Sequence, residues 1–298
     1  MSLPLIAFVG LGKMGAPMAR NVLKAGYTVR GHDREVSIAA RLSDSASFAW
    51  CASAADAVRG ADLVILMLPD SDIVDHVLWQ GESPLSAQMT PGAMVIDMSS
   101  SDPMRSRENA QRLKARGLGF IDAPVSGGVK KAEAGTLAIM IGGDAALVDR
   151  ARPVLEAMGQ TLTHLGDTGA GHAVKALNNY VSAAGLLAVC EALAAAEKFG
   201  IDPHRVNQVF NASTGRNNTT ENKVEAFMLN GAFNSGFSLA LMKKDLETAN
   251  QFIGQVESAA EFSAECLRMW RRADRFLGEG ADHTKLYAYI RNGIADPQ

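Results

Sequence analysis

A glycine-rich segment near the start of the chain, Gly10-Leu-Gly-Lys-Met-Gly15, constrains the fold more than any other feature. The residues before it, Leu5 to Val9, form an unbroken apolar run, which is typical of a strand buried on both faces of a parallel sheet. After the glycines, apolar residues recur at helical spacing up to Gly26, which suits the position just past a helix end. A strand, a Gly-x-Gly-x-x-Gly turn and a helix together predict a dinucleotide-binding unit.

Each glycine of this loop has its own expected role. Gly10 permits the tight turn, Gly12 lets the backbone approach a pyrophosphate, and Gly15 allows close packing of helix and strand. The free N–H groups at the start of the following helix then face the phosphates. We therefore expect the whole loop to contact the cofactor, through Gly10, Leu11, Gly12, Lys13, Met14 and Gly15.

An acidic residue, Asp33, follows the second expected strand, at residues 28–32. It lies 23 residues after Gly10, close to the offset of an acid that accepts hydrogen bonds from an adenosine ribose. A carboxylate at this position repels a 2′-phosphate, which favours NAD over NADP. Arg34 opposes this interpretation, because an arginine here is able to pair with that phosphate. The alternative to a ribose-binding role is that Asp33 is only a structural residue in the turn at the end of the strand.

Strand-like and helix-like segments alternate as far as residue 165 and predict an α/β fold with a doubly wound Rossmann sheet. Further strands are expected at residues 62–67, 93–96, 118–121, 137–141 and 161–165. Helices are expected at residues 54–60, 73–78, 103–116 and 145–158. The segments at 79–92 and 122–135 are rich in turn residues and are expected to be loops.

Ligands of doubly wound sheets bind beyond the carboxyl ends of the strands. Three expected exit loops, at Leu68-Pro69, Ser99-Ser100 and Ser126–Gly128, are therefore candidates for one shared crevice. Each loop taken singly is equally well explained as an ordinary polar turn.

The strand pattern ends near Gly166, and the rest of the chain, residues 166–298, predicts an all-helical domain. Its first element is an alanine-rich helix from about Gly169 to Phe199, on which Lys175 and Asn179 share one face, one turn apart. A lysine and an asparagine at this spacing suit the binding of a carbonyl or hydroxyl oxygen, although such a pair is more often simply solvated. Further helices are expected at residues 203–211, 239–253 and 258–277, followed by a short last one, with a polar break at 213–220.

Bulk composition excludes several classes of function. A formal net charge of -3 provides no basic surface for nucleic acid or anionic membrane. Three widely spaced cysteines fit reduced thiols in the cytoplasm, and six histidines without metal-ligand spacing predict no metal site. The alanine-rich helix carries glutamates and a lysine in its C-terminal part, which argues against its being a membrane span. The apolar run at the start of the sequence is short, which argues against a secretory leader.

Five segments, in their order along the chain, resemble the β-hydroxyacid dehydrogenase family, which includes 3-hydroxyisobutyrate dehydrogenase and tartronate semialdehyde reductase. They are Phe8–Gly15, Asp97–Ser100, Asp122–Gly128, Gly169–Asn179 and Lys244–Leu246. The resemblance covers nearly the whole chain. It implies a Rossmann domain followed by an all-helical domain built on a long bridging helix. The implied activity is NAD(P)-dependent hydride transfer to or from a small 3-hydroxy acid.

The resemblance also implies roles for particular residues. Lys175 matches the family's catalytic lysine, which handles the hydroxyl proton, and Asn179 matches its partner one turn later. Substrate contacts are implied for Ser126, Gly127, Gly128, Lys175, Asn179, Phe237 and Lys244. Beyond the glycine loop, cofactor contacts are expected at Asp33, Arg34, Leu68, Pro69, Ser100 and Lys244.

The family usually forms dimers or tetramers through the helical domain, so a homo-oligomer is implied here. Lys130 and Lys131 depart from the family pattern and fit either a larger or doubly acidic substrate or two solvated side chains. The substrate itself stays open among 3-hydroxyisobutyrate, glycerate or tartronate semialdehyde, serine and threonate. Two alternatives to a dehydrogenase are a non-catalytic NAD sensor or scaffold and an imine reductase of the same fold, in which the lysine is typically replaced.

The identity of residue 33 generates a prediction about cofactor choice. We expect kcat/KM to be higher with NAD than with NADP, and the substitution Asp33→Ala to narrow that ratio, because it removes the charge that repels a 2′-phosphate. Initial rates with both cofactors, for wild type and variant, measure the ratio. A wild-type preference for NADP would instead assign cofactor choice to Arg34.

Overall fold

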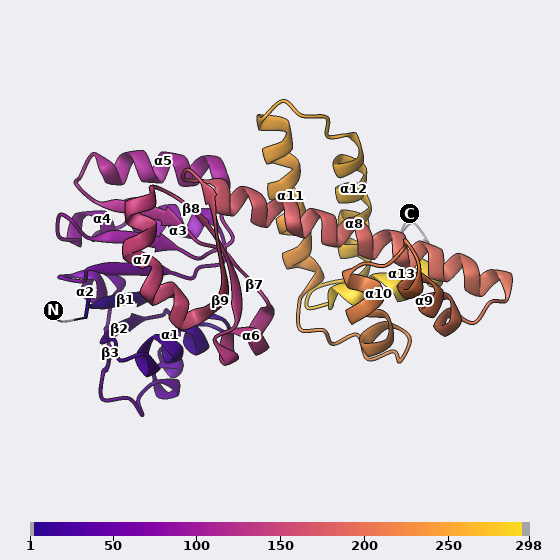
Figure 1. The fold of residues 1–298 in the computed structure, drawn as a ribbon, viewed down its shortest axis with the longest axis horizontal. Coiled ribbons are helices and arrows are strands. Elements are labelled where there is room, and N and C mark those ends of the chain that lie inside the picture. The colour runs from indigo at the N-terminus through magenta and orange to yellow at the C-terminus, as the bar shows by residue number, and fades with distance from the viewer. Residues whose placement is uncertain (1–2, 294–298) are drawn as a thin grey trace. The chain divides into compact units, whose positions relative to one another are not determined.

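The computed structural model describes residues 3–293, which form two units, Met1–Lys175 and Ala176–Gln298. The first unit is built on a nine-stranded sheet with helices on both faces (Figure 1). Its strands run in the order β3-β2-β1-β4-β5-β6-β8-β7, with β9 paired to β8. Their bounds are β1 Ile6–Val9, β2 Val29–His32, β3 Phe48–Trp50, β4 Leu63–Leu66, β5 Met94–Asp97, β6 Gly119–Asp122, β7 Val125–Ser126, β8 Leu137–Gly142 and β9 Gly159–Gly166.

Two hydrophobic cores lie on opposite faces of this sheet, because successive strand residues point to opposite sides. In β1, for example, Ile6 and Phe8 belong to one core, and Ala7 and Val9 belong to the other. Helices α1, α6 and α7 contribute to the first core, and α2 to α5 contribute to the second. Their bounds are α1 Gly15–Lys24, α2 Ala54–Val58, α3 Ser71–Trp79, α4 Leu85–Gln88, α5 Pro103–Lys114, α6 Gly128–Ala134 and α7 Ala145–Met158; a 3-10 helix, η1, spans Val36–Arg41.

The expected α/β fold is confirmed, with local corrections. The segment at 122–135, expected to be a loop, instead contains the two-residue strand β7 and the helix α6. The segment at 79–92 contains the short helix α4, and β3 and η1 were not expected at all. These elements span only two to seven residues, too few for a hydrophobic period to be visible in the sequence.

The sheet also departs from a purely parallel arrangement at one side. β1 to β6 pair in parallel, whereas β8 runs antiparallel to β6 and β7, and β9 runs parallel to β8. Strand direction is not visible in an apolar run, because a buried strand has the same composition in either direction.

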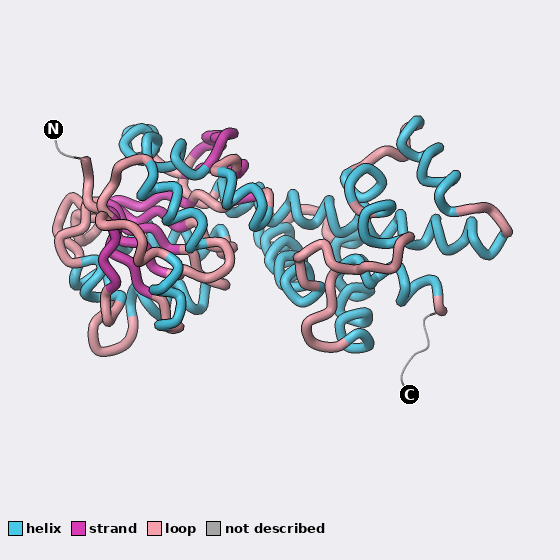
Figure 2. The backbone as a smooth tube through the Cα atoms, turned by 90° about the horizontal axis from the view of Figure 1, so that it is seen from below, coloured by secondary structure: helices cyan, strands magenta, loops and turns pink. Residues whose placement is uncertain are grey.

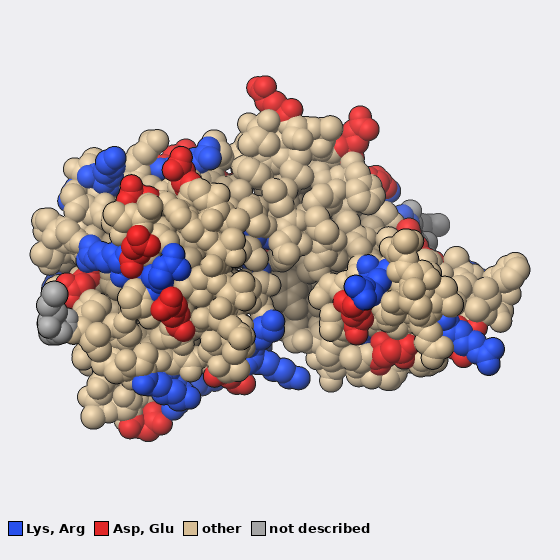
Figure 3. Space-filling model, in the orientation of Figure 1, with Lys and Arg blue, Asp and Glu red and all other residues tan. Residues whose placement is uncertain are grey.

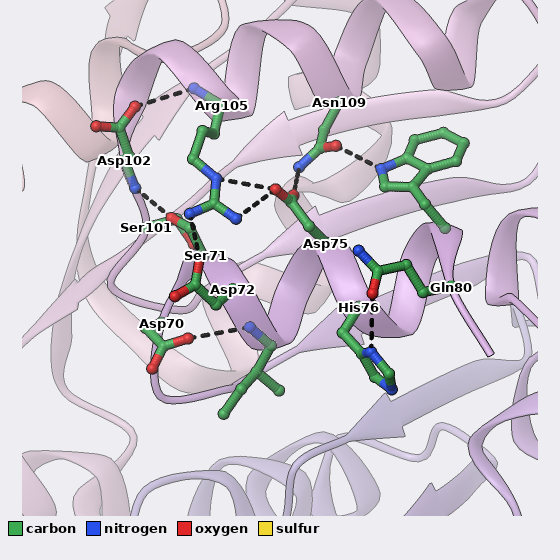
Figure 4. A network of polar contacts seen from close by, with 12 residues as sticks. Asp70, Ser71, Asp72, Asp75, His76, Gln80, Ser101, Asp102, Arg105 and Asn109 are labelled. Atoms are coloured by element: carbon green, nitrogen blue, oxygen red, sulfur yellow. Dashed lines mark hydrogen bonds and ion pairs between the residues drawn. The ribbon is translucent and has the colours of Figure 1, made fainter.

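Helices α3 and α5 are joined by a network of polar side chains (Figure 4). Arg105 forms ion pairs with Asp72, at 2.6 Å, and with Asp75. The buried Asn109 donates to Asp75 at 2.6 Å and accepts from the Trp79 indole at 2.6 Å. These contacts satisfy polar groups between two packed helices, so we expect Asn109 to contribute to stability.

Among its described residues the second unit consists of helices joined by loops, and its one β-type contact is an isolated bridge between Ser238 and Asp282 (Figure 2). The long helix α8, Ala170–Phe199, begins in the first unit and continues through the second, as expected from the sequence. The remaining elements are α9 Pro203–Ala212, α10 Asn218–Asn222, the π-helix η2 Val224–Met228, α11 Leu239–Gln255, α12 Glu261–Leu277, the 3-10 helix η3 His283–Lys285 and α13 Leu286–Arg291. The expected polar break at 213–220 is shorter than predicted, because a capping box between Asn217 and Thr220 starts α10.

The apolar character of α8 has an explanation in the packing of the second unit. Within residues 3–293, α8 alone is long and apolar enough to cross a membrane by length and composition, a test that core helices also pass. Ala183, Leu186 and Leu193 of this helix are fully buried in one core with residues of α11 and α12. Charged side chains of both signs are interspersed over the face shown in Figure 3, in keeping with a net charge of -3.

Candidate functional site

The glycine loop between β1 and α1 has the backbone geometry that its sequence predicts. Gly10 has a φ of +95°, and a Cβ atom there would overlap the Met67 carbonyl oxygen. A Cβ at Gly15 would overlap the carbonyl oxygen of Gly10, so the helix starts in close contact with the turn. A Cβ at Gly12, in contrast, would meet no described atom within 4 Å. The backbone at Gly12 is therefore open to a ligand.

The start of α1 lacks a capping side chain among the described residues. The Ala16 N–H donates to the Gly12 carbonyl oxygen at 3.1 Å and Pro17 has no N–H, so the helix start offers an anion the Gly15 N–H and the positive end of the helix dipole. Of the other loop residues, Leu11 is buried, Met14 is half-buried and Lys13 is exposed. This arrangement fits the phosphates of a dinucleotide.

Asp33 is hydrogen-bonded to the glycine loop at the end of β2. The Leu11 N–H donates to one carboxylate oxygen at 2.7 Å, and the Glu35 N–H donates to the other at 2.9 Å. Each carboxylate oxygen retains acceptor capacity for a ribose hydroxyl. Arg34 is exposed, and within residues 3–293 its side chain forms no hydrogen bond or ion pair.

Two of the three expected exit loops, at Leu68-Pro69 and Ser99-Ser100, start side by side after β4 and β5, and the segment that follows β6 starts next to them. β4, β5 and β6 are parallel and in register, so that Leu66 pairs with Asp97 and Asp97 pairs with Asp122. The first two loops are also joined directly, because the Leu68 N–H donates to the Ser99 hydroxyl at 3.0 Å. Pro69 and Ser100 lie in these same two loops, exposed and half-buried respectively.

The third loop, Ser126–Gly128, forms the junction between β7 and α6. Gly127 and Gly128 have φ angles of +135° and +68°, which other residue types rarely adopt. Ser126 pairs with Ala138 of β8 in the sheet. Lys130 and Lys131 are both exposed on α6.

Lys175 and Asn179 lie one turn apart on α8, as predicted. Lys175 is half-buried, whereas the Asn179 side chain is buried and donates to Asp245 at 2.6 Å. Asp245 in turn pairs with Lys244 at 3.1 Å. The second unit therefore brings Asn179 and Lys244 together through a buried carboxylate.

Four buried polar residues near these positions were not predicted to belong to the site: Asp97, Asp122, His172 and Asp245. All four lie within segments already quoted, so their place in those segments was the available signal. His172 lies three residues before Lys175 and offered no signal beyond that position. Burial raises the pKa of Asp122, and the nearby His172 ring and the backbone N–H groups of Gly169, His172 and Asp122 itself oppose that shift.

Phe237, one of the implied substrate contacts, packs edge-to-face on His283 at 5.7 Å between ring centroids. The Nδ1 atom of His283 lies 2.9 Å from the Phe237 carbonyl oxygen, so Nδ1 carries the hydrogen in this contact. Burial, and then the nearby Lys223, lower the pKa of His283 to about 4, although the Phe237 carbonyl and Asp282 oppose the shift. Among the described residues, no cluster of three or more histidine, cysteine or acidic side chains is arranged to hold a metal ion.

Comparison with protein families matches both parts of the chain. Residues 5–166 match the NAD-binding domain of 6-phosphogluconate dehydrogenase. Residues 169–290 match the NAD-binding domain of NADP-dependent 3-hydroxyisobutyrate dehydrogenase.

Individual relatives cover most of the chain. A 2-(hydroxymethyl)glutarate dehydrogenase from Eubacterium barkeri is 38% identical over 82% of this chain and 80% of its own length. An NAD-dependent L-serine dehydrogenase from Pseudomonas aeruginosa is 38% identical over 89% of this chain and 91% of its own. The structure of Mycobacterium tuberculosis 3-hydroxyisobutyrate dehydrogenase with L-serine superposes with a TM-score of 0.88, at 35% identity, over 97% of this chain and 100% of the other.

The buried state of His283 predicts a pH dependence of stability. The pKa of His283 is about 4 in the folded chain, against an ordinary value of 6.5. At pH values between these two, the unfolded chain therefore binds a proton at this histidine that the folded chain does not bind. We expect the free energy of unfolding to fall by about 3 kcal/mol as the pH drops from 6.5 to 4 through this group.

Urea unfolding at several pH values measures this dependence. The substitution His283→Gln should reduce the difference in the free energy of unfolding between pH 6.5 and pH 4, because it removes the titrating group. His76→Gln, which alters an exposed histidine of α3, is the matched control and should leave the dependence unchanged. If the free energy of unfolding of His283→Gln changed with pH as steeply as that of wild type, the assignment of this pH dependence to His283 would be wrong.

Proposed function

Because this chain belongs to the β-hydroxyacid dehydrogenase family and is an NAD(P)-dependent oxidoreductase of small 3-hydroxy acids, we propose that Lys175 transfers the proton of its reaction and that Asn179 assists it. One observation carries this assignment. A single helix, α8, holds Lys175 in the unit that contains the glycine loop and holds Asn179 in contact with Asp245, beside Lys244.

The glycine loop, Asp33 and the exit loops are the proposed holders of the dinucleotide. The exposed backbone at Gly12 and the uncapped start of α1 support placement of the phosphates there. Asp33 would accept the ribose hydroxyls, and Leu68, Pro69 and Ser100 would line the path toward the reactive ring. When bound, the nicotinamide accepts or supplies the hydride. We propose NAD as the preferred cofactor, supported by the position of Asp33 and by the relative named NAD-dependent.

The proposed role of Lys175 is proton transfer at the substrate oxygen. In the oxidation direction its amine removes the hydroxyl proton, and in the reduction direction its ammonium returns one to the carbonyl oxygen. The amide of Asn179, itself held by Asp245, would orient the lysine or the same oxygen. Ser126, Gly127 and Gly128 are the proposed binders of the substrate carboxylate. Phe237 and Lys244 are two further proposed substrate contacts.

The choice among substrates is proposed to depend on residues beyond this shared set. Relatives named for L-serine and for 2-(hydroxymethyl)glutarate differ in side chain and in the number of carboxylates. The exposed Lys130 and Lys131, close in sequence to the carboxylate-binding turn, support inclusion of doubly acidic substrates among those tested.

We further propose a homo-oligomer assembled through the second unit and located in the cytoplasm. Several large apolar side chains of that unit are exposed, including Val181, Phe199 and Phe262, at 67%, 85% and 63% of their surface. Such exposure supports burial against another copy. A monomeric mass by light scattering would contradict the oligomer. The free thiols of all three cysteines support a reducing compartment, which cell fractionation tests.

The functional division of the chain is proposed at residues 1–165 and 166–298. The compact units divide ten residues later, after Lys175, because the first turn of α8 packs within the first unit. Limited proteolysis tests this division. Cleavage confined to residues 160–170 would support it, and cleavage at other positions without cleavage at 160–170 would argue against it.

A panel of acids with both cofactors tests the proposed activity. We expect NAD reduction with at least one of L-serine, 3-hydroxyisobutyrate, glycerate, threonate and 2-(hydroxymethyl)glutarate, measured by absorbance of the reduced cofactor. Binding of NAD without turnover on any of them would support a sensor or scaffold. Reduction of cyclic imines with no activity on hydroxy acids would instead support an imine reductase.

The role of Lys175 is tested with the best acid of that panel. We expect Lys175→Ala to lower kcat by about 10²–10⁴, because proton transfer by a positioned side chain contributes about this factor. The Kd for NAD, from quenching of intrinsic fluorescence, should change little. Near-normal kcat in this variant would reject the assignment.

A further inference from the structure

We propose that Asp122 and His172 are positioning residues that clamp the first turn of α8 to the exit loops of the sheet and thereby fix the place of Lys175. The inference rests on the proposed function of Lys175. It adds two residues that act through their contacts with the backbone and with neighbouring loops, without contact to the reacting atoms.

The first half of the clamp is a carboxylate at the start of the helix. Asp122, the last residue of β6, is fully buried, and its two oxygens accept from the N–H groups of Gly169 at 2.7 Å and His172 at 2.8 Å. Gly169 directly precedes α8 and His172 lies in its first turn, so neither N–H group has a partner inside the helix. Asp122 therefore caps α8 from 47 residues away in sequence, and its charge lies at the positive end of the helix dipole.

Close packing shows that this turn has little freedom to move. A Cβ atom at Gly171 would overlap the Met140 carbonyl oxygen of β8 and lie 2.9 Å from an Asp122 oxygen. A Cβ at Gly142 would lie 2.6 Å from the other Asp122 oxygen and 2.8 Å from the Ala170 nitrogen. The helix start and the sheet are thus in contact along their backbones, on both sides of the carboxylate.

The second half of the clamp is the buried imidazole of His172, which is 1% exposed. Its Nε2 atom lies 3.1 Å from the Ser99 carbonyl oxygen, which only accepts, so Nε2 carries a hydrogen and donates. Its Nδ1 atom lies 2.7 Å from the Ser106 hydroxyl of α5. The ring therefore joins the helix to the loop after β5 and to α5, with Asp97 and Asp122 each within 4 Å of a ring nitrogen.

These contacts extend to the loops proposed to hold the cofactor. Ser99 accepts from the Leu68 N–H through its hydroxyl and from His172 through its carbonyl. Lys175 lies one turn after His172 on the same helix. The clamp consequently sets both the rotation of α8 and the spacing between Lys175 and the exit loops of β4 and β5. A shift of about 1 Å in such a spacing is enough to lower a rate by about a hundredfold.

Three substitutions test the clamp. Asp122→Asn keeps the shape but replaces one acceptor and removes the charge. His172→Leu removes both polar contacts of the ring, and His172→Gln restores a donor toward Ser99. We expect Asp122→Asn and His172→Leu to lower kcat about 10- to 100-fold, with less than a threefold change in the Kd for NAD. We expect His172→Gln to recover most of the loss.

Asn109→Ala is the matched control. It removes another buried side chain with two hydrogen bonds, in the α3–α5 network of Figure 4, which does not involve α8. We expect this variant to lose stability in urea while the kcat of its folded fraction stays within twofold of wild type. A kcat loss in Asn109→Ala equal to that in His172→Leu would reduce the clamp to general stability and overturn the inference.

Hydrogen–deuterium exchange separates this inference from the proposed function. Faster exchange at residues 169–175 in both clamp variants, together with lower kcat and rescue by His172→Gln, supports the clamp. Faster exchange with unchanged kcat overturns it and leaves the proposed function standing. If the wild-type protein turns over no acid of the panel, the proposed function is overturned. If exchange at residues 169–175 is the same in the clamp variants as in wild type, the clamp is overturned, whether or not the protein has activity.

Discussion

The parallel register of β4, β5 and β6 is the constraint on which the first unit depends. Backbone hydrogen bonds place Leu66, Asp97 and Asp122 side by side at the carboxyl ends of three strands. The loops at Leu68 and Ser99 begin at this edge, and the start of α8 is hydrogen-bonded to it through Asp122. The chemistry proposed for this chain therefore depends on sheet geometry before it depends on any single side chain.

Two buried carboxylates have comparable places in the two units. Asp122 accepts from backbone N–H groups at the start of α8, and Asp245 accepts from the Asn179 side chain one turn beyond Lys175. Each is within the core of its own unit, where an unpaired charge is costly and a fully bonded one is tolerated. Lys175 thus lies between two positions at which α8 is held by a charged group.

Features fixed by local chemistry could be predicted from the sequence. The glycines at 10, 12 and 15 and the length of α8 follow from short-range rules and have the expected structure. The direction of β8, the strand β7 and the helix α6 could not be predicted, because they depend on pairing with distant strands. The same holds for the contacts of His172, whose partners lie 66 and 73 residues away in sequence.

The continuity of α8 has a consequence for how this chain can change in evolution. Each residue of an α-helix turns the chain by about 100° and advances it by about 1.5 Å. A single insertion or deletion between His172 and Asn179 would therefore swing every later side chain out of phase with those before it. The Asn179 amide would then no longer face Asp245. Insertions and deletions should therefore be absent between His172 and Asn179 in homologues that retain the reaction. Substitutions at the exposed positions Val174 and Asn178 should be tolerated.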